Sequence, residues 1–514
     1  MDDLKLTIET LTEEDRRELA TFIRRQKKKK SRKDLDLYRL LQQQKKYSAE
    51  ELIKLLYPDA PNPVAYYALR KRLQRHLTDF ILLKRMEEDI TAASPITGLM
   101  SLANYLFDAG IDRLAWNHLR KAEKLAQANE QYGLLNAVYN LQIEKADSEY
   151  ADPLDEIILK RNQNKLIADE DERANIASSI INLRLRAVRQ QGSSMHFNKI
   201  IKEVLQTYNL SEAVSQRPSL LYKLMSIARS AILARKDFLS FEPYIINQYQ
   251  EMEQRQGFKK AHQYYKLRLL YMISHVLYRN KKFEKSVAYL EQLKAGMTTE
   301  GKSHAHLFMP RYTFLMVANL VFLNRNSEAI SLMESMLNNS KITLNTKDQL
   351  TAQLGLSFNY FTAGAYTKAN RMLMSIKRSD KWCEDKMGRD WVLKKKLGEL
   401  ILQYELGNDD LVYSKLRTLE RTYKDLWEDP MYRNVKQFLV LIKLLMEQPD
   451  LVTKPAFVQH VDNTLEFTTF RETDLQAMSY YAWLKSKMIQ KPYYEVLLEL
   501  AKNAYLEQLQ AEQS

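Results

Sequence analysis

One arrangement of residues recurs along this chain: an apolar helix end, a short polar turn that often holds Gly or Asn, and an aromatic or apolar residue near the start of a second amphipathic helix. The clearest copies turn at Phe238, Phe283, Asn326, Tyr366 and Asp410, and weaker copies turn at Ile111 and Phe197. From Phe238 onward the turns lie 45, 43, 40 and 44 residues apart. A near-constant period of this size is typical of stacked helical hairpins.

The composition agrees with a helical repeat. A chain of 514 residues is too long for one hydrophobic core, and only 12 Gly and 12 Pro interrupt it. Hydrophobic residues make up 45% of the chain, which is enough to bury a core. We therefore expect an all-α fold: a right-handed solenoid of helical hairpins with a period of about 40–45 over residues 91–514, preceded by a basic helical module over residues 1–90.

Two copies, "AGAYTKANRML" and "AGIDRLAWNHL", resemble the turn and second helix of tetratricopeptide repeats. In that family a small residue after the turn lets neighbouring helices approach. Ala329, Ala369 and Ser286 occupy that position here, whereas Leu114 and Tyr413 depart from it. The usual tetratricopeptide period is shorter, at 34 residues, so these are lengthened, divergent copies. The layout is also similar to that of the long all-helical repeat proteins common in Bacteroidota, and it implies no enzymatic activity.

The stretch "GMTTEGKS", from Gly296 to Ser303, fits the phosphate-loop pattern G-x-x-x-x-G-K-[ST]. A phosphate loop follows a buried strand and opens a helix, so that backbone N–H groups and the helix dipole hold the phosphate. Here the preceding segment has apolar residues at helical spacing, among them Phe283, Leu290 and Leu293. The pattern therefore predicts a connection between two repeats, and we expect no nucleotide cofactor.

Other chemical signals are weak. His304 and His306 are two residues apart, a spacing that puts them on different faces of a helix, and no third ligand follows at a suitable position. Cys383 is the only cysteine, which excludes an intrachain disulfide and any cysteine-rich metal site. No zinc-protease motif or nucleophile elbow is present. We expect no catalytic residue, no cofactor and no metal.

The segment "HQYYKLRLLYMISHVLY" predicts a helix with an aromatic and cationic face. Aromatic residues often anchor partners in helical-repeat grooves, because they bury much area at low entropic cost. The predicted anchors are Tyr264, Arg268, Tyr271 and His275. In the alternative interpretation this face is ordinary surface, and the core stripe is formed by Tyr265, Leu269, Met272 and Val276.

The first ninety residues carry a dense run of positive charge. Between residues 16 and 33 there are ten Lys or Arg and a single acid, Glu18. The residues of this run that could contact nucleic acid are Arg24, Arg25, Lys27, Lys28, Lys29, Lys30, Arg32 and Lys33. In the alternative interpretation the run is the solvated face of an N-terminal helical cap.

A second basic segment follows. Ser48 with Glu51 predicts a capping box that opens a helix, and Pro63 suits the first turn of a longer one. The segment from residue 48 to 77, with Leu52, "YPD" at residues 57–59 and Leu69, resembles the helix–turn–helix of bacterial winged-helix activators that carry tetratricopeptide-like domains. In that family the second helix reads the major groove. The resemblance makes the readers Arg70, Lys71, Arg72 and Arg75. The chain departs from the family because helix continues where a β-hairpin wing belongs.

These patterns lead to two functional hypotheses. The first is a non-enzymatic cytoplasmic scaffold that binds a protein or peptide on the concave face of the solenoid. The second is a regulator in which residues 16–75 contact DNA or RNA, consistent with a net charge of +14. No secretory signal and no apolar stretch long enough for a membrane span are visible, so we expect no membrane partner.

Overall fold

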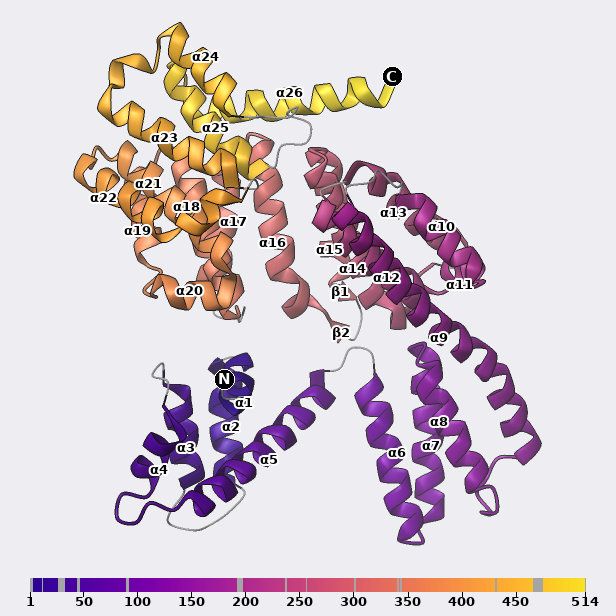
Figure 1. The fold of residues 1–514 in the computed structure, drawn as a ribbon. Helices are drawn as coiled ribbons and strands as arrows, with labels where there is room; N and C mark the ends of the chain where they lie inside the picture. Colours follow the sequence, from indigo (N-terminus) through magenta and orange to yellow (C-terminus); the bar gives the residue numbers. More distant parts are fainter. Residues whose placement is uncertain are drawn as a thin grey trace. The chain divides into compact units, whose positions relative to one another are not determined.

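The structure, a computed structural model, describes residues 3–11, 13–25, 33–43, 47–88, 92–191, 197–235, 238–255, 257–299, 302–339, 342, 344–429, 432–465 and 475–513. These residues form an all-α fold, and its only strands in the described part are two residues long each. Contacts divide the chain into two compact units, Met1–Glu172 and Arg173–Ser514, and the division falls inside one long helix (Figure 1). The boundary predicted after residue 90 stays a prediction.

The first unit contains the helices α1 (Asp3–Thr10), α2 (Glu13–Arg25), α3 (Lys33–Gln42), α4 (Ala49–Leu56), α5 (Pro63–Glu88), α6 (Ala93–Asp108), α7 (Asp112–Ala128), α8 (Tyr132–Glu144) and the first part of α9 (Leu154–Gln191). The predicted capping box is confirmed: the Ser48 side chain accepts a hydrogen bond from the Glu51 amide at 3.1 Å, and the Ser48 amide donates to Glu51 at 2.7 Å. The long helix predicted from Pro63 is also confirmed. One core, with Leu19, Tyr38 and Leu73 fully buried, joins α1 to α5.

The second unit begins with the remainder of α9 and continues through α10 (Phe197–Thr207), α11 (Ser211–Gln216), α12 (Pro218–Arg235), α13 (Phe238–Arg255), η1 (Lys260–His262), α14 (Gln263–Arg279), α15 (Phe283–Gly296), β1 (Thr298–Thr299), β2 (Lys302–Ser303), α16 (Ala305–Phe322), α17 (Asn326–Asn338), α18 (Thr346–Thr362) and α19 (Tyr366–Met374). It ends with α20 (Asp380–Met387), α21 (Arg389–Glu405), α22 (Asp409–Thr422), η2 (Lys424–Glu428), α23 (Arg433–Glu447), η4 (Pro449–Leu451), α24 (Pro455–Thr464), α25 (Leu475–Met488) and α26 (Tyr493–Gln513).

Consecutive helices pack side by side as hairpins, most extensively in α6–α7, α14–α15, α16–α17, α18–α19 and α25–α26 (Figure 1). Five of the residues predicted at the turns are the first residues of helices: Phe197, Phe238, Phe283, Asn326 and Tyr366. The turns predicted at Ile111 and Asp410 lie one residue from the starts of α7 and α22. The sequence pattern therefore located the hairpin turns correctly.

The turns share one backbone geometry. In each, a residue with positive φ ends the first helix, and the next residue donates its amide hydrogen to the carbonyl five residues earlier, at 2.9 to 3.1 Å. This pattern satisfies carbonyls that a helix end leaves unpaired. The residues with positive φ are Gly110, Lys281, Asn324, Gly364 and Gly407. The last four lie 43, 40 and 43 residues apart, so the repeated turn accounts for the period seen in the sequence.

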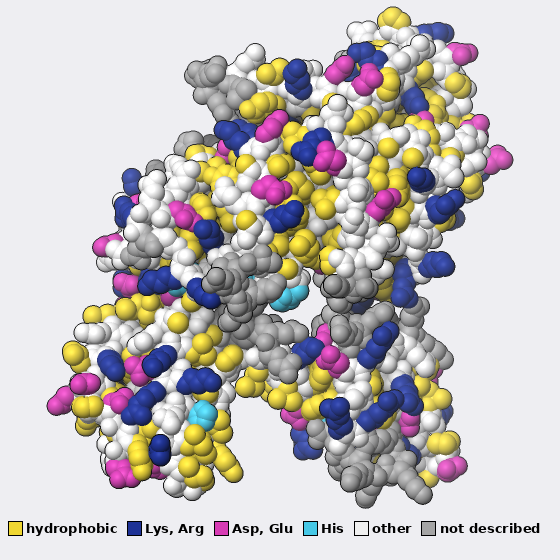
Figure 2. All heavy atoms as spheres, turned by 180° about the vertical axis from the view of Figure 1, so that it is seen from behind, with side chains coloured by type: hydrophobic (Ala, Val, Ile, Leu, Met, Phe, Trp, Pro, Cys, Tyr) yellow, Lys and Arg dark blue, Asp and Glu magenta, His cyan; other side chains and the backbone are white. Residues whose placement is uncertain are grey.

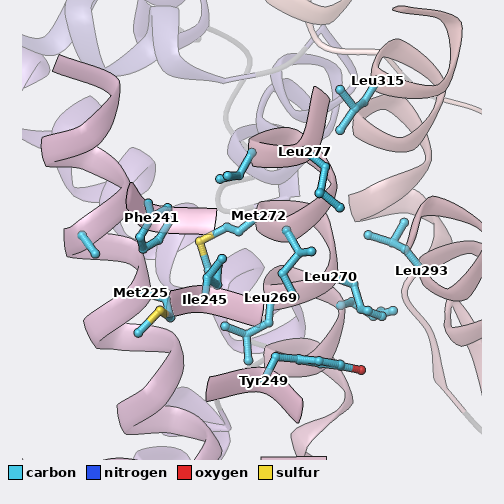
Figure 3. Packing of buried hydrophobic residues seen from close by; sticks show 14 of the residues in the cluster. Met225, Phe241, Ile245, Tyr249, Leu269, Leu270, Met272, Leu277, Leu293 and Leu315 are labelled. Atoms are coloured by element: carbon cyan, nitrogen blue, oxygen red, sulfur yellow. The ribbon is translucent and has the colours of Figure 1, made fainter. Parts of the chain in front are cut away.

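The largest core of the second unit joins α9 to α18. Figure 3 shows its central part, where side chains of five helices meet. The labelled residues are Met225 on α12; Phe241, Ile245 and Tyr249 on α13; Leu269, Leu270, Met272 and Leu277 on α14; Leu293 on α15; and Leu315 on α16. The small residues Ser286, Ala329 and Ala369 are fully buried where the helices of each hairpin meet. Among the helices that the structure describes, none is both long and apolar enough to cross a membrane.

A buried group of charges lies on α21. The Lys395 ammonium is 2.5 Å from one oxygen of Glu399, and the Lys415 ammonium is 3.0 Å from the other. Lys396 pairs with Asp380 at 2.7 Å. Burial alone raises the pKa of Glu399, but the three lysines outweigh burial and the pKa is lowered. We call these five side chains the lysine–glutamate network.

Candidate functional site

The four predicted anchors lie on one side of α14. Tyr264, Arg268, Tyr271 and His275 follow one another at intervals of four, three and four residues, which places them on a common helix face. All four are half-buried. They are therefore neither part of the closed core nor ordinary exposed surface.

The apolar stripe predicted on the same helix is mostly confirmed. Leu269, Met272 and Val276 are buried, whereas Tyr265 is half-buried and contacts the ring of Tyr222. Since α14 packs against α12, α13, α15 and α16, it has core neighbours on most sides. The predicted anchors occupy the side that is left partly open.

Two side chains of α12 complete this side. The Tyr222 ring meets the Tyr264 ring edge to face at 6.1 Å. The Arg268 guanidinium lies 5.4 Å from the centre of the Tyr264 ring and 5.7 Å from that of Tyr222. Further along, the Arg229 guanidinium lies 5.8 Å from the centre of the Tyr271 ring. Guanidinium groups at such distances are held by the electron-rich ring faces.

Positive charge gathers here without a partner in the part of the chain that the structure describes. Burial lowers the pKa of Arg229, and the charges of Arg268 and of Arg311 on α16 lower it further. The Nε atoms of Arg229 and Arg268 are buried and have no hydrogen-bond partner. Buried donors of this kind are rare in folded proteins, so these two call for an explanation.

His275 closes one end of the group. Burial lowers the pKa of His275 to about 3, and Arg229 and Arg279 act in the same direction. The imidazole is therefore neutral at neutral pH. Its Nδ1 atom is also buried without a hydrogen-bond partner, and its ring meets the Phe238 ring at 6.2 Å. We use the name arginine–tyrosine face for Tyr222, Arg229, Tyr264, Arg268, Tyr271, His275 and Arg311.

Three members of this face were not found from the sequence. Tyr222 lies 42 residues before Tyr264, Arg229 lies 39 residues before Arg268, and Arg311 lies 43 residues after Arg268. These intervals match the repeat period, so the same position of neighbouring repeats carries the same type of side chain. Comparing the copies position by position, rather than examining one helix alone, would have found them.

The basic residues predicted near the N-terminus have diverse environments. Arg24 and Arg25 are exposed at the end of α2. Lys33 is engaged inside the unit: its ammonium donates to the Leu56 carbonyl at 2.9 Å and lies 3.8 Å from the centre of the Tyr57 ring. The remaining predicted contacts of this run, Lys27, Lys28, Lys29, Lys30 and Arg32, lie outside the described residues.

The second basic helix, α5, presents only part of its predicted reading face. Lys71 and Arg75 are exposed, whereas Arg70 is half-buried. Arg72 is 3.7 Å from Asp34 on α3, so its charge is directed into the unit. The helix then runs on to Glu88, and the described residues of the first unit contain no strand that could form a wing.

An open pocket between α2 and α3 was not predicted. It has a volume of about 290 Å³ and is lined by four guanidinium groups, those of Arg16, Arg17, Arg24 and Arg39. Tyr38 lies in its wall and donates to the Arg16 carbonyl at 2.9 Å. Burial raises the pKa of Tyr38 to about 12, so the hydroxyl stays protonated. The sequence gave no signal for Arg39, because its separation from Arg24 hides the packing of the two helices.

The phosphate-loop pattern falls in a connection between two helices. The segment before Gly296 is α15, as predicted, and residues 298–303 contain the small antiparallel pair β1–β2, with Thr298 opposite Ser303. Gly296 contacts α14 closely: a Cβ atom there would lie 2.8 Å from the Gln263 amide nitrogen. Packing of α15 on α14 therefore accounts for this glycine.

The described residues bring together no group of three His, Cys, Asp or Glu side chains suited to a metal ion. Cys383, the single cysteine, is fully buried. On the side of the molecule shown in Figure 2, lysine and arginine side chains alternate with acidic and apolar ones rather than forming a single basic surface. Comparisons with known protein families and with curated proteins find no match to this chain.

Proposed function

We propose that this protein is a non-enzymatic, cytoplasmic scaffold whose hairpins stack as a right-handed, tetratricopeptide-like solenoid and whose partner is a protein or peptide. The observation that carries the proposal is the arginine–tyrosine face, in which half-buried tyrosines and arginines from α12, α14 and α16 surround buried donors without acceptors. The repeated turn with a period of 40 to 43 residues supports the solenoid.

The arrangement is suited to binding because its groups are already positioned. Tyr222 and Tyr264 hold Arg268 between their rings, which limits the side-chain entropy that binding would cost. Tyrosine and arginine are also the residues most often found at the energetic centres of protein interfaces. A partner segment crossing α14 gains apolar contact from the rings and hydrogen bonds from the guanidinium groups.

A photo-crosslinking experiment tests this proposal. Benzoylphenylalanine replaces Arg311, which is exposed at the edge of the face, and in a control protein it replaces Arg417, which is exposed on α22. After irradiation in the native cell, we expect protein adducts at position 311 that are absent at position 417. Adducts that are identical at both positions, or no protein adduct at position 311, would contradict the scaffold.

A second candidate function rests on the pocket between α2 and α3. Four guanidinium groups around one open space, together with the exposed Arg25, Lys71 and Arg75, support contact with the phosphates of DNA or RNA. Such contacts release counterions, so binding falls steeply as salt rises. We expect weak, sequence-independent binding at low salt that is largely lost near physiological ionic strength.

Two double variants separate phosphate contact from base reading. Arg17→Gln/Arg24→Gln removes pocket charge and is expected to lower affinity equally for all sequences and to flatten the salt dependence. Lys71→Gln/Arg75→Gln alters preference among sequences only if α5 reads base edges. Retention of full affinity by both variants in an anisotropy titration would exclude this region as the nucleic-acid interface.

A further inference from the structure

The arginine–tyrosine face has a charge imbalance that restricts what it binds. Arg229, Arg268 and Arg311 come from three different helices and are close enough for the latter two to lower the pKa of the first. No ion pair neutralises any of them among the described residues. Arg311 lowers the pKa of Asp348, but burial outweighs this effect and raises it.

Asp348 is also committed elsewhere. Its carboxylate accepts a hydrogen bond from the Asn345 side chain at 2.7 Å, and its amide donates to Asn345 at 2.9 Å, which together cap the start of α18. A fold that holds three guanidinium groups together pays for their mutual repulsion and for partial desolvation. That cost is offset when an anion enters.

We propose that the arginine–tyrosine face binds a partner segment rich in Asp and Glu, and that a carboxylate of that segment enters between Arg229 and Arg268. This inference rests on the proposed scaffold function and specifies the chemistry of its partner. The buried Nε atoms of these two arginines supply the hydrogen bonds, and apolar parts of the segment pack on Tyr222 and Tyr264.

Carboxylates fit this face for geometric reasons. A guanidinium presents parallel N–H groups that match the two oxygens of a carboxylate, and such charge-assisted bonds are stronger than neutral ones. The donors are half-buried between tyrosine rings, so a short, slim acidic side chain reaches them. The neutral imidazole of His275 leaves the whole positive charge of the site to the arginines.

The surrounding charges favour a peptide over a polynucleotide. A nucleic-acid strand carries a phosphate at every nucleotide and needs cations in succession along its path. Next to the three arginines, Lys266 is paired with Glu253 at 2.6 Å and Lys282 with Glu242 at 3.0 Å. These neighbouring carboxylates repel further phosphates, whereas a peptide with one local group of acids avoids them.

The experiment uses a phage-displayed library of random peptides, selected on the full-length protein and depleted on the double variant Arg229→Gln/Arg268→Gln. We expect enriched peptides with clustered Asp or Glu next to an apolar residue. Selected peptides are then made with blocked ends, together with twins in which Asn and Gln replace Asp and Glu. Enrichment of neutral or basic peptides, or no enrichment over the double variant, overturns the inference.

Fluorescence anisotropy then measures affinity. The acidic peptide is expected to lose at least about tenfold in affinity on the double variant, the equivalent of one charge-assisted hydrogen bond. The same loss is expected for the twin on the unmodified protein. Arg311→Gln, an exposed substitution that leaves packing intact, is expected to weaken binding, and Arg417→Gln, which removes the same charge from α22, is expected not to.

The outcomes also separate this inference from the scaffold itself. Equal binding of peptide and twin, or tighter binding of a labelled oligonucleotide that the double variant abolishes, overturns the acidic partner. Protein adducts at position 311 would then still support the scaffold. Absence of those adducts counts against the scaffold, whatever the peptides do.

Discussion

Two groups of charged side chains lie below the surface of the second unit, and they differ in how their charge is balanced. In the lysine–glutamate network, Glu399 is held between Lys395 and Lys415, and Asp380 takes the charge of Lys396. On the arginine–tyrosine face, three arginines have rings beside them but no carboxylate. One group is complete within the chain, and the other lacks an anion.

The difference separates a structural role from a binding role. A buried ion pair rarely adds much net stability, but removing one member of it is costly, because the other is left buried and unpaired. Cations already left unpaired have no such member to lose. The two groups are therefore expected to respond in opposite ways to the removal of charge, which makes the comparison testable.

The largest effect is expected at Glu399. Replacing it by Gln leaves Lys395 buried without a compensating charge, and we expect the free energy of unfolding to fall by about 3–5 kcal/mol. Urea denaturation followed by circular dichroism measures the change. Glu420→Gln, an exposed substitution on α22, is the control. An unchanged midpoint for Glu399→Gln would show that the network is not balanced as described.

Acid separates the two groups through His275 and Glu399. The folded pKa of His275 is about 3, below the usual 6.5. The unfolded chain therefore binds a proton first, and stability is lost as pH falls from 6.5 towards 3. Between pH 7 and pH 5 this loss amounts to about 2 kcal/mol. The pKa of Glu399 is lowered from 4.5, so its contribution is lost only below that value.

The measurement is urea unfolding at a series of pH values. In His275→Leu the decrease between pH 7 and pH 5 is expected to be smaller than in the unmodified protein by about the same 2 kcal/mol. His460→Leu, on the exposed side of α24, serves as the control. Identical pH profiles for the His275 variant and the unmodified protein would mean that His275 does not stay neutral in the folded state.

A smaller effect of opposite sign is expected at Arg229. Arg229→Met keeps most of the volume and removes a buried charge that Arg268 and Arg311 repel. Stability is expected to stay the same or to rise by up to about 1 kcal/mol, because an unpaired buried charge is replaced by an apolar group. If this variant loses as much stability as Glu399→Gln, Arg229 has a structural partner and the comparison fails.

The smallest effect is a change in the reactivity of Cys383, which lies next to the lysine–glutamate network. Burial raises the pKa of its thiol, although Lys395 opposes the change, and the side chain is fully buried. Labelling by iodoacetamide in the folded protein is therefore expected to be slow. Glu399→Gln should accelerate it by loosening α20 and α21, and Arg229→Met should not. Fast labelling of the unmodified protein would be the contrary result.

The sequence predicted the features that depend on local chemistry. Hairpin turns were located because the residues near them, such as Gly364 and Gly407, suit a positive φ that most residues avoid. The capping box at Ser48 and the first turn at Pro63 are equally local. These features depend on a few neighbouring residues, and the rest of the fold does not change them.

The features that escaped prediction depend on distant packing. Lys395 and Glu399 are four residues apart and looked like an ordinary surface pair; they are buried because α20 and α22 cover α21. Lys33 was taken for a nucleic-acid contact, yet its ammonium reaches the Leu56 carbonyl 23 residues away. For the candidate face, Arg268 was identified and Arg229 was not, because one helix was examined without its neighbours.

One contact of the last hairpin concerns how the chain is made. The Tyr494 hydroxyl donates to the Val321 carbonyl at 2.6 Å, across 173 residues of sequence, and the Tyr493 ring meets the Phe361 ring at 5.2 Å. At ordinary ribosome speeds, Val321 is synthesised about 9 to 35 seconds before Tyr494. Phe361 must wait for most of that interval without its cover. The folding of this region is therefore timed by translation, and a slower ribosome lengthens the exposure in proportion.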